Sequence, residues 1–174
     1  VRVPRLTEGL AAGLAIWGAE AAAVHEEWLR TRPEDYDPAV RLRLQQGLVV
    51  TGTDVARAQR TRRLLERDLQ LLFEEVDLLA TPTCALEAPQ RGACSVVVDG
   101  VEVEVLAALT RFSRVFNLVG LPAISVPCGF SVAGLPFGLQ LVGAWLDEAR
   151  LLRAAYGYEQ ATPWHQRRCG LITG

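Results

Sequence analysis

The sequence predicts an α/β fold in which a mixed β-sheet is flanked by helices on both faces. Two features of the chain lead to this prediction. Ala-, Leu- and Arg-rich segments with helical spacing alternate with short apolar segments that end at Gly or Pro. The segments 123–128 and 137–142 are apolar at nearly every position, which is typical of strands that are covered on both faces.

The N-terminal part of the chain is expected to form two helices. Residues 6–30 are rich in Ala and have high helix propensity, and Thr7 is the expected N-cap. A loop then leads to a shorter helix, which Asp37 is expected to cap. Pro38 occupies the first position of this helix and Gly47 lies just past its end, as is common at helix termini.

A second long helix is expected over residues 54–76, with Thr53 as its N-cap. Its apolar residues mostly follow helical spacing. The helix carries five Arg and five acidic residues, so its net charge is zero. This balance indicates a solvent-exposed face with ion pairs between successive turns, rather than a stripe that binds nucleic acid.

The middle of the chain contains the signals of a strand and a hairpin. Residues 77–83 form a short apolar segment interrupted by Pro82, which is typical of a buried strand that runs into a loop. Asp99-Gly100 separates two Val-rich segments, 95–98 and 101–105. An Asp-Gly pair in this position is a strong signal for a β-hairpin.

The last part of the chain should complete the sheet and add a final helix. Residues 104–113 are predicted to be helical, and the two apolar segments described above are predicted to be strands joined by a Gly-Leu-Pro turn. Asn117 is the single polar side chain in the apolar approach to the first strand, so it either holds a loop or faces a ligand. Asp147 is expected to cap the last helix, which ends near Thr162.

The composition excludes several classes of protein. Half of the residues are hydrophobic and the net charge is −2, which excludes a disordered chain and gives no general attraction to nucleic acid or anionic lipid. No apolar segment reaches the roughly 20 residues that a membrane helix needs. The chain contains no Lys, which excludes a catalytic lysine within it. Because it begins at Val1 and contains no Met, we expect a piece of a longer cytoplasmic protein or one chain of an assembly.

The common catalytic motifs are absent from the sequence. None of the four serines lies in a G-x-S-x-G motif, and Ser131 is interpreted as a turn residue. Cys84 and Cys128 are candidate thiol nucleophiles with His25 or His165 as a base, but free cysteines are more often small core residues. No two cysteines have the spacing of metal ligands, so we expect reduced thiols and neither a metal nor a cofactor. The four cysteines are Cys84, Cys94, Cys128 and Cys169.

A longer pattern allows a more specific interpretation. After Phe112, the chain reads Asn-Leu-Val-Gly-Leu-Pro-Ala-Ile-Ser-Val-Pro-Cys-Gly over residues 117–129, and Gly-Leu-Pro-Phe-Gly-Leu-Gln-Leu-Val-Gly over 134–143. This run closely resembles the C-terminal part of the amidase signature family. The Thr-Pro-Thr segment at 77–83, the helices before it and the final helix are similar to the same family in the same order. The resemblance covers nearly the whole chain.

The resemblance implies an activity that this chain does not carry alone. The family cleaves the amide bond of carboxamides or transfers the released ammonia. Its catalytic residues are a serine nucleophile, a second serine in a cis peptide and a lysine, all in the N-terminal half of the enzyme. We therefore expect residues 1–174 to be a single partial domain, the C-terminal portion of an amidase-like domain without its catalytic half. Such a chain supplies strands and pocket walls, contains no catalytic residue and is inactive by itself.

The resemblance also implies which residues line the substrate pocket and which alternatives remain. Six residues are candidates for the walls of a pocket that binds a small-molecule amide. They are Thr81, Pro82, Thr83, Cys84, Thr110 and Asn117. One alternative is the A subunit of a tRNA-dependent amidotransferase, although such subunits tend to carry an acidic residue where this chain has Thr110. Another is a non-catalytic remnant that binds a partner through an exposed sheet edge, and a homo-oligomer is also possible.

Overall fold

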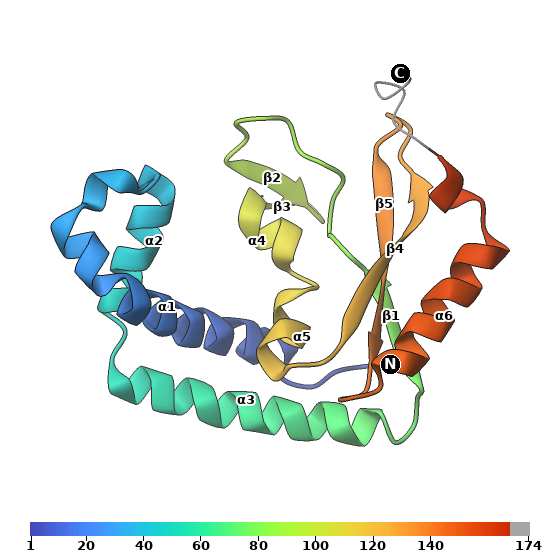
Figure 1. The fold of residues 1–174 in the computed structure, drawn as a ribbon, viewed down its shortest axis with the longest axis horizontal. Helices are drawn as coiled ribbons and strands as arrows, with labels where there is room; N and C mark the ends of the chain where they lie inside the picture. The colour runs from blue at the N-terminus through green and yellow to red at the C-terminus, as the bar shows by residue number, and fades with distance from the viewer. Residues whose placement is uncertain (168–174) are drawn as a thin grey trace. The chain divides into compact units, whose positions relative to one another are not determined.

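The computed structural model describes residues 1–167, and it confirms an α/β protein (Figure 1). The chain forms two compact units, with the boundary between Leu71 and Leu72. The elements of the first unit are α1 (Leu6–Thr31), the 3₁₀ turn η1 (Pro33–Asp35), α2 (Pro38–Leu48) and α3 (Gly52–Leu72). Those of the second are β1 (Leu78–Pro82), β2 (Ser95–Val98), β3 (Val101–Glu104), α4 (Val105–Thr110), α5 (Arg114–Val119), β4 (Ala123–Phe130), β5 (Pro136–Gly143), α6 (Glu148–Ala161) and η2 (Trp164–Gln166).

Close backbone contact joins the first two helices. Gly18 on α1 faces Gly47 on α2, and a Cβ atom on Gly47 would lie 2.1 Å from the carbonyl oxygen of Gly18. Gly47 is buried inside the last turn of α2, rather than just past the helix as predicted. The helices therefore approach as closely as two backbones can, which only glycine permits.

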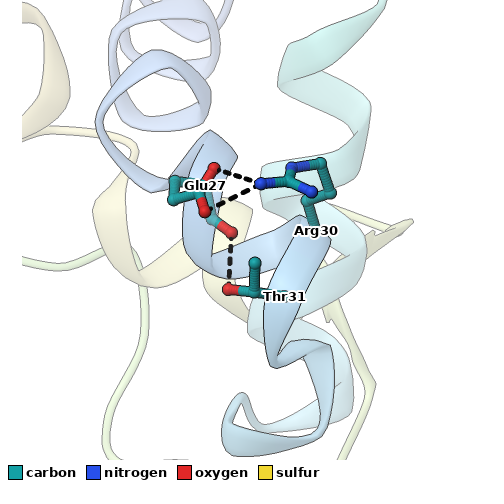
Figure 2. A network of polar contacts seen from close by, with 3 residues as sticks. All are labelled: Glu27, Arg30 and Thr31. Atoms are coloured by element: carbon teal, nitrogen blue, oxygen red, sulfur yellow. Dashed lines mark hydrogen bonds and ion pairs between the residues drawn. The ribbon is translucent and has the colours of Figure 1, made fainter.

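A small polar network lies at the C-terminal end of the long helix α1. Figure 2 shows Arg30 and Thr31 around Glu27. The Arg30 guanidinium donates to both carboxylate oxygens of Glu27 at 2.8 Å, and the Thr31 hydroxyl donates to the Glu27 carbonyl oxygen at 2.8 Å. Both charged side chains are mostly exposed, so the ion pair itself contributes little to stability. Arg30 also lies in the last turn, where a cation complements the helix dipole.

The helix starts of the first unit partly differ from the predictions. Asp37 caps α2 as predicted, because its carboxylate accepts a hydrogen bond from the Ala39 amide at 2.9 Å. Thr7 is not the cap of α1, since the helix already begins at Leu6. The N-cap of α1 is Arg5, which has a left-handed φ of 57° and makes no side-chain capping hydrogen bond.

The second long helix is capped by Thr51 instead of Thr53. The Thr51 hydroxyl accepts from the Asp54 amide at 3.1 Å, and the Asp54 carboxylate accepts from the Thr51 amide at 3.1 Å and from its hydroxyl at 2.6 Å. This reciprocal arrangement satisfies amide groups that a helix start leaves without partners. The helix ends at Leu72 rather than Val76. Its Arg-rich face forms ion pairs as expected, for example between Arg62 and Glu66 one turn apart.

In the second unit, β1, β5 and β4 form an antiparallel sheet in that order. Leu139 and Leu141 of β5 point to the face that α6 covers, where Val126 of β4 joins them. Leu151 and Ala155 of α6 complete this core. The helices α4 and α5 lie on the other side of the sheet (Figure 1). The predicted strands and the final helix are therefore confirmed.

The face of β4 that points away from α6 is less covered by other parts of the chain than the sequence predicts. Ala123, Ser125 and Pro127, which alternate along the strand, are all exposed. The apolar composition of β4 therefore does not reflect burial on both faces within this chain. The same face borders the cavity described below.

Two short helices precede β4: the first lies within the predicted helical segment 104–113, and the second follows it and was not predicted. The first, α4, ends at Thr110, whose hydroxyl donates to the Leu106 carbonyl oxygen at 2.6 Å. The second, α5, buries Phe116 and its apolar neighbours and ends at Gly120 with a left-handed φ of 72°. The Trp145 indole donates to the Val119 carbonyl oxygen at 2.8 Å, which fixes the end of α5 beside the end of β5.

The hairpin and the cap of the last helix follow the sequence signals. Asp99 and Gly100 both have positive φ, 52° and 78°, as the tight turn between β2 and β3 requires. Asp147 is the N-cap of α6, and its carbonyl oxygen accepts from the Leu151 amide at 3.2 Å. Its carboxylate pairs with Arg150 at 2.7 Å instead of capping the helix.

Candidate functional site

The second unit contains a cavity of about 1120 Å³ beside its larger sheet. Its walls come from β1 and the loop after it, from β4 and β5, from the hairpin turn, and from the connection between α4 and α5. Most of the lining side chains are apolar, and its charged residues are Asp99 and Arg111. A concave, mainly apolar site with a few polar groups is typical of a small-molecule pocket.

Strand register places a row of polar side chains on the sheet face that borders this cavity. Thr81 of β1 and Ser125 of β4 both lie directly opposite Gln140 of β5. Directly opposite residues of antiparallel strands share a face, and so do residues two apart along one strand. Thr83 therefore lies on this same side, which we call the polar face and define by Thr81, Thr83, Ser125 and Gln140. The opposite face is the apolar one that packs against α6.

Gln140 is the central residue of the polar face. Its side chain is buried, with 4% of the residue exposed. The Nε2 group donates to the Thr81 hydroxyl oxygen at 2.9 Å and to the Phe112 carbonyl oxygen at 3.0 Å. One amide group thus ties the end of β1 and the connection between α4 and α5 to the same point of the sheet. It fixes two walls of the cavity relative to each other.

A second polar contact lies next to the first. The hydroxyl oxygens of Thr83 and Ser125 are 2.6 Å apart, although they come from the two outer strands of the sheet. They meet above Gly138 of β5, where a Cβ atom would lie 2.6 Å from each oxygen. The Thr83 amide donates to the Gly138 carbonyl oxygen at 2.9 Å, which continues the pairing of the two strands past Pro82.

The structure brings together four of the six predicted pocket residues. Thr81, Pro82, Thr83 and Cys84 all line the cavity. Thr110 is not among the lining residues, because its hydroxyl turns back to its own helix.

Asn117 is also absent from the lining of the cavity. It lies exposed on α5, on the side away from the buried residues of that helix. The described residues therefore leave this polar side chain accessible. The apolar sequence around it is explained by the buried side of α5 rather than by a strand that continues through it.

The sequence prediction missed the residues that β4 and β5 contribute. Ser125, Cys128, Phe137 and Gly138 line the cavity, and Gln140 holds its walls. One signal was available, because Gln140 is a polar residue inside an otherwise apolar segment and must find hydrogen-bond partners. For the others, the register between strands was needed.

The remaining candidate residues from the sequence are cysteines and a serine. Cys84, Cys94 and Cys128 are free thiols, whereas Cys169 lies outside the described residues. Ser131 is the turn residue that was predicted, and its hydroxyl accepts from the Leu135 amide at 3.2 Å. Over residues 1–167, no group of three or more potential metal ligands comes together, and no helix has the length and apolar character needed to cross a membrane.

Comparison with known proteins agrees with the pattern in the sequence. The sequence model of the amidase family matches residues 1–152. The chain is 39% identical over 173 residues to an amidase of Pseudomonas putida, and the alignment covers 99% of this chain and 37% of that protein. It is 36% identical over 166 residues to the A subunit of the glutamyl-tRNA(Gln) amidotransferase of Thermodesulfovibrio yellowstonii, covering 92% of this chain and 33% of that protein.

A solved structure gives the same result for the fold. It is an inhibitor-bound member of a vestigial protein complex related to the origin of an s-triazine catabolic enzyme. It is 29% identical to this chain, with a TM-score of 0.90 over 97% of this chain and 37% of its own. The chain thus spans about a third of the length of the curated relatives it matches. By its sequence and its fold, the chain belongs to the amidase family.

Proposed function

We propose that residues 1–174 form the C-terminal portion of a serine-dependent amidase that hydrolyses the C–N bond of carboxamides. In this proposal the chain is one partial domain that supplies sheet strands and the walls of the substrate pocket. The nucleophile and its base come from the remaining part of the enzyme. The enzyme would acylate its serine, release ammonia or an amine, and hydrolyse the resulting ester with water.

One observation carries the proposal: the cavity of about 1120 Å³ is lined by the predicted segment Thr81–Cys84 and is mainly apolar, as small-molecule pockets are. Activated serine and cysteine nucleophiles need a base within hydrogen-bond reach. Among residues 1–167, the hydroxyl of Ser125 contacts another hydroxyl, and the hydroxyl of Ser131 contacts a backbone amide. Neither contact supplies a base, which supports a binding role for Ser125 in the cavity; Ser95, which donates to the Glu102 carboxylate, is not among the residues that line the cavity.

A second candidate function is that of the A subunit of a tRNA-dependent amidotransferase. The similarity to glutamyl-tRNA(Gln) amidotransferases supports it. The absence of an acidic residue at position 110 argues against it, and the Thr110 hydroxyl is occupied by its own helix. A third possibility, a non-catalytic remnant that binds a partner, would use the free edges of β1 and β4.

The test compares the purified 174-residue chain with the complete protein that contains it. Both are incubated with short carboxamides, and released ammonia is measured. Both are also treated with a fluorophosphonate, which labels activated serines, and the labelled peptides are identified by mass spectrometry. We expect turnover by the complete protein only, and a labelled serine outside residues 1–174.

The possible results separate the three functions. Turnover by the chain alone, or a label on one of its own serines, would refute the proposal. Ammonia release that requires glutamine, charged tRNA and a second protein would instead identify an amidotransferase. A complete protein that hydrolyses no amide under either condition would support the non-catalytic alternative.

A further inference from the structure

The Thr83–Ser125 hydroxyl pair has hydrogen-bonding capacity that the protein does not use. Each hydroxyl has one hydrogen to donate and two lone pairs to accept. The contact of 2.6 Å between the two oxygens uses one hydrogen and one lone pair. Within residues 1–167 it is the sole hydrogen bond of either hydroxyl. One O–H group and several lone pairs therefore remain for a ligand.

The pair is accessible from the cavity. Thr83, Ser125 and Gly138 all line the cavity, and Ser125 is exposed. Because position 138 has no side chain, both hydroxyl oxygens can lie above β5. A single added Cβ atom would lie 2.6 Å from each of them, which is too close for either to remain in place. Glycine at position 138 is therefore what allows the two hydroxyls to meet at the wall of the cavity.

The surroundings of the pair favour a neutral polar group. Pro127, which lies two residues from Ser125 on the same side of β4 and lines the cavity, is apolar. The charged residues of the cavity, Asp99 and Arg111, belong to the hairpin turn and to the connection between α4 and α5, not to the sheet. Hydroxyl groups compensate a buried charge poorly, whereas they pair well with a hydroxyl or carbonyl group.

We propose that Thr83 and Ser125 form a specificity subsite that binds a hydroxyl or carbonyl group on the acyl part of the amide substrate. This inference rests on the proposed function. The nitrogen of an unsubstituted carboxamide leaves as ammonia, so any further polar group of such a substrate is on the acyl side. The subsite would make the enzyme prefer hydroxylated or carbonyl-bearing carboxamides over apolar amides of the same shape.

A purely structural role of the pair makes a different prediction. In that case the two hydroxyls only link β1 to β4 across β5, and their loss lowers the stability of the sheet without changing substrate preference. Substrate selectivity therefore distinguishes the two roles better than total activity does.

The experiment uses the complete protein and amides in which a hydroxyl replaces a methyl group of the same size. The pairs are 2-hydroxypropanamide with 2-methylpropanamide, and 3-hydroxybutanamide with 3-methylbutanamide. We expect the unmodified enzyme to have the higher kcat/KM for the hydroxylated member of at least one pair. Ser125→Ala and Thr83→Val should each reduce this preference by about tenfold, the size of one neutral hydrogen bond.

Two control variants and one stability measurement accompany this experiment. Thr83→Ser keeps the hydroxyl and should keep the preference. Ser131→Ala changes a turn serine outside the cavity and should alter neither the preference nor the activity. The midpoint of thermal unfolding is measured for every variant, so that a loss of folding is recognised.

The results that would overturn the subsite are specific. An active enzyme without preference in either pair, or with a preference that survives both Ser125→Ala and Thr83→Val, would refute it and leave the proposed amidase function standing. Lower stability with unchanged preference would assign the hydroxyl pair a structural role. A complete protein that hydrolyses no carboxamide would refute the proposed function, and the subsite with it.

Discussion

A Cβ atom on Gly47 would lie 2.1 Å from the carbonyl oxygen of Gly18, so α1 and α2 meet backbone to backbone. The contact is asymmetric. A Cβ atom on Gly18 would be 3.6 Å from the Gly47 Cα atom, which is an ordinary van der Waals distance. The first unit therefore depends on glycine at one of these positions much more than at the other.

This asymmetry predicts opposite effects of the same substitution. Gly47→Ala should lower the free energy of unfolding by about 3 kcal/mol, because the backbone of α1 must move away. Gly18→Ala should raise it by up to about 1 kcal/mol, because Ala has the higher helix propensity. Urea unfolding followed by circular dichroism measures both. Equal effects of the two substitutions would show that the helices do not cross at these residues.

A second prediction concerns Gln140. Gln140→Leu removes the donor to the Thr81 hydroxyl and to the Phe112 carbonyl oxygen, and should lower the free energy of unfolding by about 2 kcal/mol. The matched control is Gln46→Leu on the exposed side of α2, which should change it by less than about 0.5 kcal/mol.

A double-mutant cycle tests whether Gln140 acts through Thr81. The double variant Thr81→Val/Gln140→Leu should lose less free energy of unfolding than the two single variants lose in sum, because both substitutions remove the same hydrogen bond. Simple additivity of the two changes would mean that this contact does not form in solution.

A third prediction concerns the start of α3. The hydroxyl and amide of Thr51 hydrogen-bond to the Asp54 carboxylate and lower its pKa below the ordinary value, and the nearby Arg57 adds to this effect. A carboxylate with a lowered folded-state pKa stabilises the protein above its unfolded-state pKa. This contribution is lost as the pH falls from about 4 through the lower folded-state value.

Two variants isolate this effect of pH. Asp54→Asn and Thr51→Val should both make the urea midpoint less dependent on pH between about pH 5 and pH 2. The measurement is a series of urea unfolding curves across that range. A pH dependence that is the same in both variants as in the unmodified protein would contradict the assignment of Thr51 as the cap.

A fourth prediction uses the cysteines as reporters of the cavity. Cys84 is exposed and lines the cavity, whereas Cys94 is exposed outside its lining. Alkylation of Cys84 by a bulky maleimide should lower the amidase kcat/KM of the complete protein by at least about tenfold. Cys84→Ser should abolish this sensitivity and Cys94→Ser should not. Inhibition that persists in Cys84→Ser would place the sensitive thiol elsewhere.

The outcomes for individual residues show where local sequence information was sufficient. The Asp99-Gly100 turn and the Asp37 cap depend on neighbouring residues alone, and both were predicted correctly. The shift of the α3 cap from Thr53 to Thr51 is also local, but two threonines two residues apart compete for it. The actual cap is the one with an acidic residue three positions later, which accepts a hydrogen bond in return.

The candidate site was only half predictable. The Thr81–Cys84 segment was identified by resemblance and does line the cavity. Thr110 and Asn117 were also assigned to the pocket by resemblance, but neither lines this cavity, because two short helices turn their side chains elsewhere. The break between these helices does not follow from apolar composition, because apolar residues dominate on both sides of it.

By itself, the sequence determined the α/β class, most of the elements and the membership of the amidase family. These properties follow from apolar periodicity, turn residues and a long ordered motif, all of which are local or linear along the chain. Only the tertiary structure decided that Thr83 meets Ser125, because the two residues are 42 positions apart and come together through the pairing of both outer strands with β5. A shift of one residue in either pairing would turn one of the hydroxyls to the opposite face of the sheet.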